Sequence, residues 1–88
     1  RCTPYALFGS QQLSDAAVAG LQDRSATLLG HHGMICFAAS LEQVLALAIE
    51  VEALARMYLQ ALQVGEPPIL SAANMAEVLE RFAAYKSV

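Results

Sequence analysis

The sequence predicts an α/β (α+β) fold with a short helix, two strands and two C-terminal helices. Two short apolar runs, residues 26–29 and 34–37, flank the sequence Gly-His-His-Gly at 30–33. Each run has the length of a strand, and the glycines permit the reversal between them. Residues 41–64, which follow, contain no proline or glycine and predict a long helix. Strand-length runs followed by helical patterns indicate mixed α and β structure.

The N-terminal segment is predicted to be irregular or extended. Proline disfavours the helical conformation of the residue before it, so Pro4 pushes Thr3 towards an extended backbone, and Gly9 marks the end of the segment. Within it, Tyr5 and Phe8 are predicted to be aromatic anchors.

Serine residues predict where the helices begin. Ser14, followed by Asp15, is predicted to start the short helix. Ser40 has Gln43 three residues later, which is the spacing of a capping box at the start of the long helix. Prolines at 67 and 68 cannot continue that helix, and Ser71 is then the predicted cap of the last one.

The composition is unusually apolar for a chain of 88 residues, with 57% hydrophobic and only 15% charged residues. A soluble domain has about 25% charged residues, so the chain carries more apolar surface than a compact monomer of its size would cover. We expect this surface to be buried against other subunits or against a remainder of the same chain. The sequence begins with Arg1 rather than methionine, which is compatible with a processed or truncated chain.

Charge and cysteine content exclude several classes of function. The net charge is -3 and the five lysines and arginines are scattered, whereas a nucleic-acid binder needs clustered positive charge. Cys2 and Cys36 have no metal-binding spacing, and no secretion signal is present, which favours a reducing cytoplasm. Cys36 is interpreted as a small buried hydrophobic residue.

The long apolar helix raises the question of a membrane span. Glu50, Glu52 and Arg56 lie within it, and charges at that depth would cost several kcal/mol in hydrocarbon. A helix packed inside an α/β protein explains the pattern better, and no membrane partner is predicted.

His31 and His32 are the only histidines of the sequence. Successive side chains on an extended backbone point to opposite faces, so one histidine should face any chemistry and the other should face away. The alternative is that both are solvated turn residues. A catalytic zinc ion normally takes three protein ligands, which two adjacent histidines do not supply.

Three segments together resemble a known family. They are residues 3–9 (Thr-Pro-Tyr-Ala-Leu-Phe-Gly), 26–33 (Ala-Thr-Leu-Leu-Gly-His-His-Gly) and 78–85 (Val-Leu-Glu-Arg-Phe-Ala-Ala-Tyr). Their order and separations resemble the C-terminal part of the class II sugar-phosphate aldolases, in the aldolase/adducin family. The resemblance is strongest to the group that cleaves L-fuculose 1-phosphate.

The resemblance implies a fold and an assembly. Residues 1–88 would be a single partial domain, the C-terminal portion of an α-β-α layered domain with a mainly antiparallel sheet, and the N-terminal portion would be absent from this sequence. The family assembles as a homotetramer, with active sites between neighbouring subunits.

The resemblance also implies a zinc site. Three histidines hold the zinc ion in the family, and the one directly before glycine corresponds to His32, so His31 would face away. Phe8 corresponds to an aromatic residue near the substrate aldehyde. Tyr85 corresponds to a tyrosine that reaches the adjacent subunit's site as a proton donor, although a terminal tyrosine taken alone is usually a packing residue.

The implied reaction is zinc-assisted retro-aldol cleavage of a ketose 1-phosphate, such as L-fuculose 1-phosphate, to dihydroxyacetone phosphate and an aldehyde. The other two histidine ligands, the glutamate of proton abstraction and the phosphate-binding residues would all lie upstream of this sequence. We therefore expect the isolated chain to be inactive. The alternatives are a pentulose-phosphate 4-epimerase, a methylthioribulose-phosphate dehydratase, or a non-catalytic adducin-like assembly module.

Overall fold

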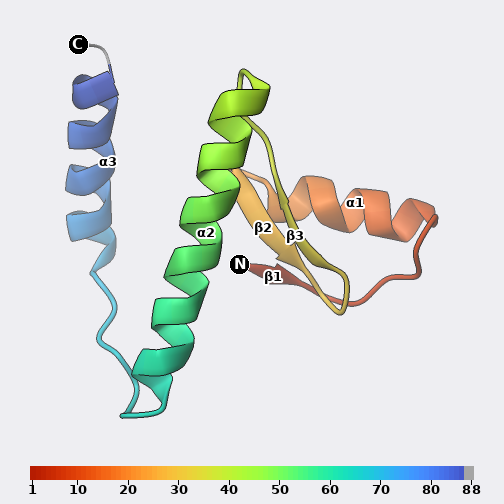
Figure 1. Cartoon of the computed structure of the whole chain (residues 1–88), viewed down its shortest axis with the longest axis horizontal. Coiled ribbons are helices and arrows are strands. Elements are labelled where there is room, and N and C mark those ends of the chain that lie inside the picture. The colour runs from red at the N-terminus through yellow and green to blue at the C-terminus, as the bar shows by residue number, and fades with distance from the viewer. Residues whose placement is uncertain (87–88) are drawn as a thin grey trace. The chain divides into compact units, whose positions relative to one another are not determined.

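The computed structural model describes residues 1–86, without the side chain of Lys86, and it contains both helices and strands, which confirms the predicted mixed class. The chain divides into two compact units, Arg1–Met57 and Tyr58–Val88. In order, the described elements are β1 (Cys2–Thr3), α1 (Gln11–Gly20), β2 (Ala26–Leu29), β3 (Gly33–Cys36), α2 (Leu41–Leu62) and α3 (Ala72–Lys86) (Figure 1).

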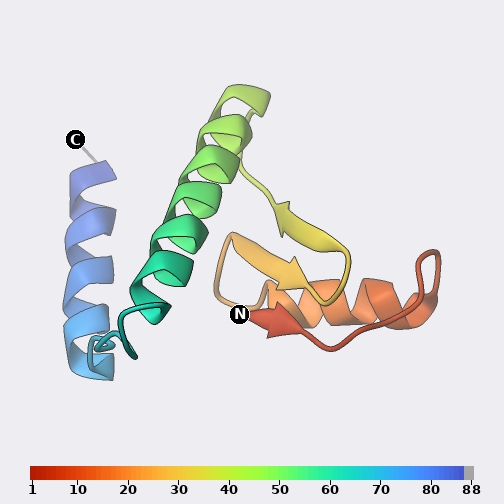
Figure 2. The same ribbon diagram turned by 60° about the horizontal axis from the view of Figure 1, so that its bottom comes forward.

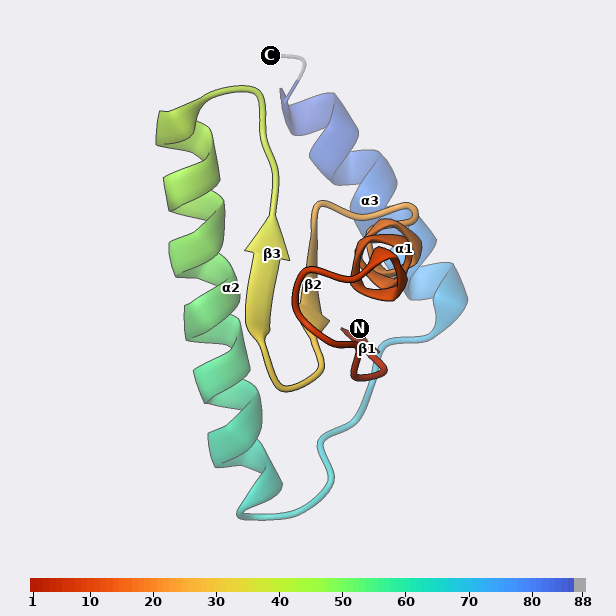
Figure 3. The same ribbon diagram turned by 90° about the vertical axis from the view of Figure 1, so that its right-hand side faces the viewer.

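The three strands form one sheet in the order β1-β2-β3 (Figure 2). β2 and β3 are an antiparallel hairpin in which Leu29 pairs with Gly33. β1 is parallel to β2, with Thr3 opposite Leu29. Parallel neighbours need a crossover connection, and α1 lies in that crossover and packs against β1 and β2 (Figure 3). The segment that leaves β1 therefore emerges at the same end of the sheet as the turn that leaves β2.

β1 is a strand that the sequence did not predict, since residues 1–10 were expected to be irregular or extended. The backbone N–H of Leu28 donates to the carbonyl oxygen of Arg1 at 2.9 Å. The two residues of β1 therefore form a strand because they pair with β2. Proline has no N–H to offer a ladder, and the strand ends at the residue before Pro4. The predicted pair of strands is therefore a three-stranded sheet.

Gly20, the last residue of α1, sets the close approach of this helix to the sheet. A Cβ atom built on Gly20 would lie 2.8 Å from Thr3 Cγ2 and 2.9 Å from Thr27 Oγ1. Both threonines are buried, at 7% and 3% exposure, and Thr27 Oγ1 donates a hydrogen bond to the carbonyl oxygen of Arg1 at 3.0 Å. Only a residue without a side chain fits at this contact.

The predicted start of α1 at Ser14 is wrong. The N-cap is Ser10, whose Oγ accepts a hydrogen bond from the backbone N–H of Leu13 at 3.1 Å. Gly9 has a φ of 72°, so the chain turns into the helix one residue before Ser10. Ser14 and Asp15 lie inside the helix, where the Asp15 carboxylate accepts from Gln11 Nε2 at 2.9 Å.

The other two predicted caps are confirmed. The backbone N–H of Gln43 donates to Ser40 Oγ at 3.1 Å. The backbone N–H of Asn74 donates to Ser71 Oγ at the same distance, 3.1 Å. α2 ends at Leu62, two residues before the predicted end.

The predicted surplus of apolar surface is confirmed. Among the residues whose side chains are described, only Thr3, Gly20 and Thr27 are buried, and none of them has a large apolar side chain. Cys36, predicted to be buried, is half-buried. Within the described part of the chain, no helix has both the length and the apolar character that crossing a membrane requires.

Candidate functional site

The turn between β2 and β3 carries both histidines. The backbone N–H of His32 donates to the carbonyl oxygen of Leu29 at 2.9 Å, which makes Gly30 and His31 the two central residues of a β-turn. His31 has a φ of 63°. A positive φ at the third position is what a type II turn requires, and glycine or asparagine normally supplies it. The turn thus holds His31 in a left-handed conformation that is uncommon for a residue with a side chain.

Gly30 brings this turn into direct contact with the segment that follows β1. A Cβ atom at Gly30 would lie 2.6 Å from the carbonyl oxygen of Thr3 and 3.1 Å from the backbone nitrogen of Tyr5. Its own N–H donates to Thr3 Oγ1 at 3.4 Å. These neighbours are backbone atoms or a buried side chain and cannot move aside easily. A side chain at position 30 would therefore push the two segments apart.

The ring of Tyr5 contacts both histidines. Its centroid lies 5.7 Å from that of His32 with 16° between the planes, a stacked arrangement. It lies 5.7 Å from that of His31 with 85° between the planes, an edge-on arrangement. Since His31 is left-handed rather than extended, alternation along a strand does not separate the two histidines. They differ instead in how they meet the same tyrosine.

His32 has a second partner in the same segment, because its Nε2 lies 2.7 Å from the carbonyl oxygen of Ala6. A carbonyl oxygen only accepts, so Nε2 carries the hydrogen in this contact, and in the neutral imidazole Nδ1 then has the lone pair. Histidines that bind a metal almost always donate their other ring N–H to a carbonyl, a carboxylate or water. The surroundings of His32 therefore fit one zinc ligand.

The described residues do not supply a complete metal site. No group of three or more histidine, cysteine, aspartate or glutamate side chains among them could hold a metal ion. His32 can accordingly be one ligand of a site whose other ligands come from outside these residues.

Phe8 lies in the same segment as the two partners of His32, two residues after Ala6. Its ring is 76% exposed, and its backbone precedes the Gly9 turn that leads into α1. The structure therefore brings the segment of Phe8 to the histidine turn and leaves the ring itself free to meet another molecule.

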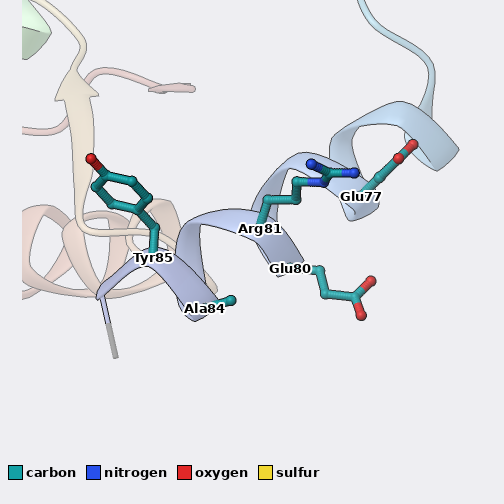
Figure 4. A pocket seen from close by; sticks show the side chains of 5 residues that line it. All are labelled: Glu77, Glu80, Arg81, Ala84 and Tyr85. Carbon is teal, nitrogen blue, oxygen red and sulfur yellow. The ribbon is translucent and has the colours of Figure 1, made fainter. Parts of the chain in front are cut away.

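Tyr85 lies in the second compact unit, near the C-terminal end of α3, with a side chain that is 84% exposed. Arg81 is one turn earlier on the same face of the helix (Figure 4). The two residues line an open surface hollow together with Glu77, Glu80 and Ala84. Among the described residues of this unit, none forms a hydrogen bond or ring contact with the phenol, and the predicted role of Tyr85 at a neighbouring subunit stays a prediction.

The sequence singles out His32 as a candidate ligand but does not predict its contacts with Tyr5 and Ala6. Tyr5 was predicted to be an aromatic anchor, without a partner. Its partner follows from the parallel pairing of β1 with β2, and a strand of two residues has no periodicity that a sequence pattern could show.

Residues 1–59 match the family model described as the class II aldolase and adducin N-terminal domain. Over 85 residues the chain is 48% identical to an L-fuculose phosphate aldolase of Escherichia coli (strain K12), covering 96% of this chain and 40% of the relative. Over 85 residues it is 47% identical to a 5-methylthioribulose-1-phosphate/5-deoxyribulose-1-phosphate aldolase of Rhodospirillum rubrum, covering 97% of this chain and 38% of the relative.

A solved structure of an L-fuculose 1-phosphate aldolase superposes with a TM-score of 0.87 and 32% identity, covering 94% of this chain and 39% of that one. The chain thus spans about 40% of the length of the curated relatives that it matches. On the family match and these identities, the chain belongs to the class II aldolase and adducin family.

Proposed function

We propose that this chain is part of a class II sugar-phosphate aldolase that cleaves a ketose 1-phosphate, such as L-fuculose 1-phosphate, to dihydroxyacetone phosphate and an aldehyde. The observation that carries the proposal is the environment of His32. One ring nitrogen is engaged by a backbone carbonyl at 2.7 Å, no described residue forms a hydrogen bond with the other, and the chain is 48% identical to an L-fuculose phosphate aldolase.

In the proposed site, His32 supplies one nitrogen ligand to a zinc ion. A bound zinc ion would act as a Lewis acid that polarises the substrate carbonyl and offsets negative charge on its oxygen. His32 binds in its neutral form, and its orientation is held through the nitrogen that does not ligate. The remaining ligands, the base and the phosphate-binding residues are proposed to lie in an N-terminal part of the domain that this sequence does not include.

Phe8 and Tyr85 are proposed to act on the aldehyde side of the substrate. The exposed ring of Phe8 would give the aldehyde an apolar wall, which supports orientation without competing hydrogen bonds. The Tyr85 phenol would transfer a proton in the site of a neighbouring subunit, once it is within hydrogen-bond reach of the substrate oxygen. That assignment requires a homo-oligomer, and we propose the tetramer of the family.

The rest of the chain is compatible with this setting. The exposed apolar side chains of the described residues support burial against other subunits and against the N-terminal part of the domain. Cys2 and Cys36 are free thiols, which supports a reducing, cytoplasmic location.

A second candidate reaction is aldol cleavage of a 5-deoxy or 5-methylthio ketose phosphate, favoured by the 47% identity to the Rhodospirillum rubrum relative. The 4-epimerase and dehydratase alternatives share the same metal chemistry and need a substrate test. A non-catalytic assembly module is disfavoured by the retention of a histidine whose second nitrogen is already held in place.

The test uses a hybrid aldolase, in which the N-terminal part of the Escherichia coli relative precedes residues 1–88 of this chain. We expect it to contain zinc and to cleave L-fuculose 1-phosphate, with L-ribulose 5-phosphate and 5-methylthioribulose 1-phosphate assayed in parallel. His32→Ala should lower the rate by about 100-fold or more, since several kcal/mol of charge stabilisation depend on the metal.

His31→Asn is the matched control, because asparagine tolerates the left-handed backbone and the ligand is untouched. It should still bind zinc and lose far less activity than His32→Ala, because it removes only the edge-on ring contact with Tyr5 and not the proposed ligand. A hybrid that folds without zinc, or a His32→Ala variant with an unchanged rate, would contradict the proposed function.

A further inference from the structure

We propose that Tyr5 is a positioning residue for His32, holding the imidazole in the orientation in which it binds metal. This inference rests on the proposed function of His32 as a zinc ligand. It gives a role to a residue that the sequence predicts only as an aromatic anchor, and it concerns the apolar face of the imidazole rather than its nitrogens.

Two contacts of different direction fix the imidazole plane. The stacked ring of Tyr5, 5.7 Å away and tilted by only 16°, restrains motion perpendicular to the plane. The hydrogen bond from Nε2 to the Ala6 carbonyl, at 2.7 Å, restrains rotation within the plane. His32 is otherwise exposed, so without these contacts its side chain would occupy several rotamers.

Tyr5 can restrain another ring because it is itself restrained, although its side chain is 58% exposed. His31 meets it edge-on with 85° between the planes. The backbone of Tyr5 packs closely against Gly30, since a Cβ atom at Gly30 would lie 3.1 Å from the Tyr5 nitrogen. Stacked and edge-on pairs are both favoured geometries for aromatic rings, so Tyr5 is held by the same turn that it orients.

The consequence is a ligand that is ordered before the metal arrives. A ligand that is already oriented loses less conformational freedom on binding, and the residues that orient metal ligands typically contribute about 10- to 100-fold in metal affinity. Stacking depends on the ring and not on the hydroxyl. Phenylalanine should therefore replace Tyr5, whereas an aliphatic residue should not.

The experiment measures zinc affinity of the hybrid aldolase by competition with a chelator, and visible absorption after replacing zinc with Co²⁺. Tyr5→Leu should weaken zinc binding by about 10-fold and change the Co²⁺ spectrum, because the ligand geometry changes. Tyr5→Phe should match the parent in both measurements. Phe37→Leu, which truncates another exposed aromatic side chain of the same unit, is the control and should leave both unchanged.

The outcomes separate this inference from the proposed function. A parent hybrid without zinc, or a His32→Ala variant with the affinity of the parent, would remove the proposed function and this inference with it. If His32→Ala loses zinc but Tyr5→Leu keeps the affinity and spectrum of the parent, only the positioning role is overturned. A Tyr5→Phe variant as weak as Tyr5→Leu would overturn the stacking account. Tyr5→Met repeats the test if the leucine variant does not fold, and failure of both to fold would assign Tyr5 to folding alone.

Discussion

His31 and His32 are adjacent, but the turn places them in different backbone conformations and gives their rings different contacts. His31 occupies the left-handed position with a φ of 63°, so its first requirement is conformational. His32 returns to the ordinary region and presents a ring with one free nitrogen. Alternation along an extended backbone predicted that the two side chains would face opposite ways, but it did not say which one would face the site. The resemblance to the family singled out His32, and the hydrogen bond to Ala6 supports that choice on independent grounds.

The left-handed conformation of His31 should make the stability of the fold sensitive to the residue at this position. In the hybrid aldolase, His31→Val should lower the free energy of unfolding by about 1–2 kcal/mol, because a β-branched residue at positive φ brings its side chain against the neighbouring carbonyl. His31→Asn, which loses the same ring contact with Tyr5 but tolerates this backbone conformation, should be less destabilised. Urea unfolding followed by circular dichroism measures both, and equal stability of the two variants would mean that this backbone conformation is not required.

At the scale of elements, two of the three helix starts followed from nearby residues, whereas the strand pairing of β1 did not. Ser40 and Ser71 were recognised as caps because the donor that each serine accepts from lies three residues away. The predicted cap at Ser14 was wrong because Ser10, just after the left-handed Gly9, provides a capping hydroxyl four residues earlier. β1 could not be predicted, since its partner strand begins more than twenty residues later, and the contact of Tyr5 with His32 depends on that pairing.

The contact of α1 with the sheet predicts a clear effect at Gly20. Gly20→Ala should lower the free energy of unfolding of the hybrid by about 1–3 kcal/mol, because the added methyl meets two buried threonines at 2.8 and 2.9 Å and overpacking forces them to move. Alanine is the better helix former by up to about 1 kcal/mol, which offsets only part of the loss.

Gly65→Ala is the matched control for Gly20→Ala. No atom of the described residues lies within 4 Å of a Cβ built at Gly65, so this variant should keep the stability of the parent. Guanidinium or urea titration of the three proteins decides the matter. A Gly20→Ala variant as stable as Gly65→Ala would show that the helix can shift away from the sheet at no cost.

At the scale of the whole molecule, apolar surface is the dominant feature. A domain of this length would ordinarily bury about 60% of the surface that its unfolded chain exposes, yet no large apolar side chain of the described residues is buried. Composition alone predicted the surplus, because 57% hydrophobic residues exceed what so short a chain can cover. Composition could not predict which faces stay open, because that depends on how the elements pack.

The open apolar surface predicts how the 88-residue chain should behave by itself. Without a buried apolar core, hydrophobic burial cannot offset a conformational entropy cost of about 1–2 kcal/mol per residue. We expect the isolated chain to unfold without a cooperative transition in urea, to bind the dye ANS, and to show no aldolase activity. The hybrid, in which we propose that these faces are covered, should unfold cooperatively and bind little dye. A sharp, dye-free unfolding transition of the isolated chain would instead mean that the sheet and α1 suffice to hold a stable fold.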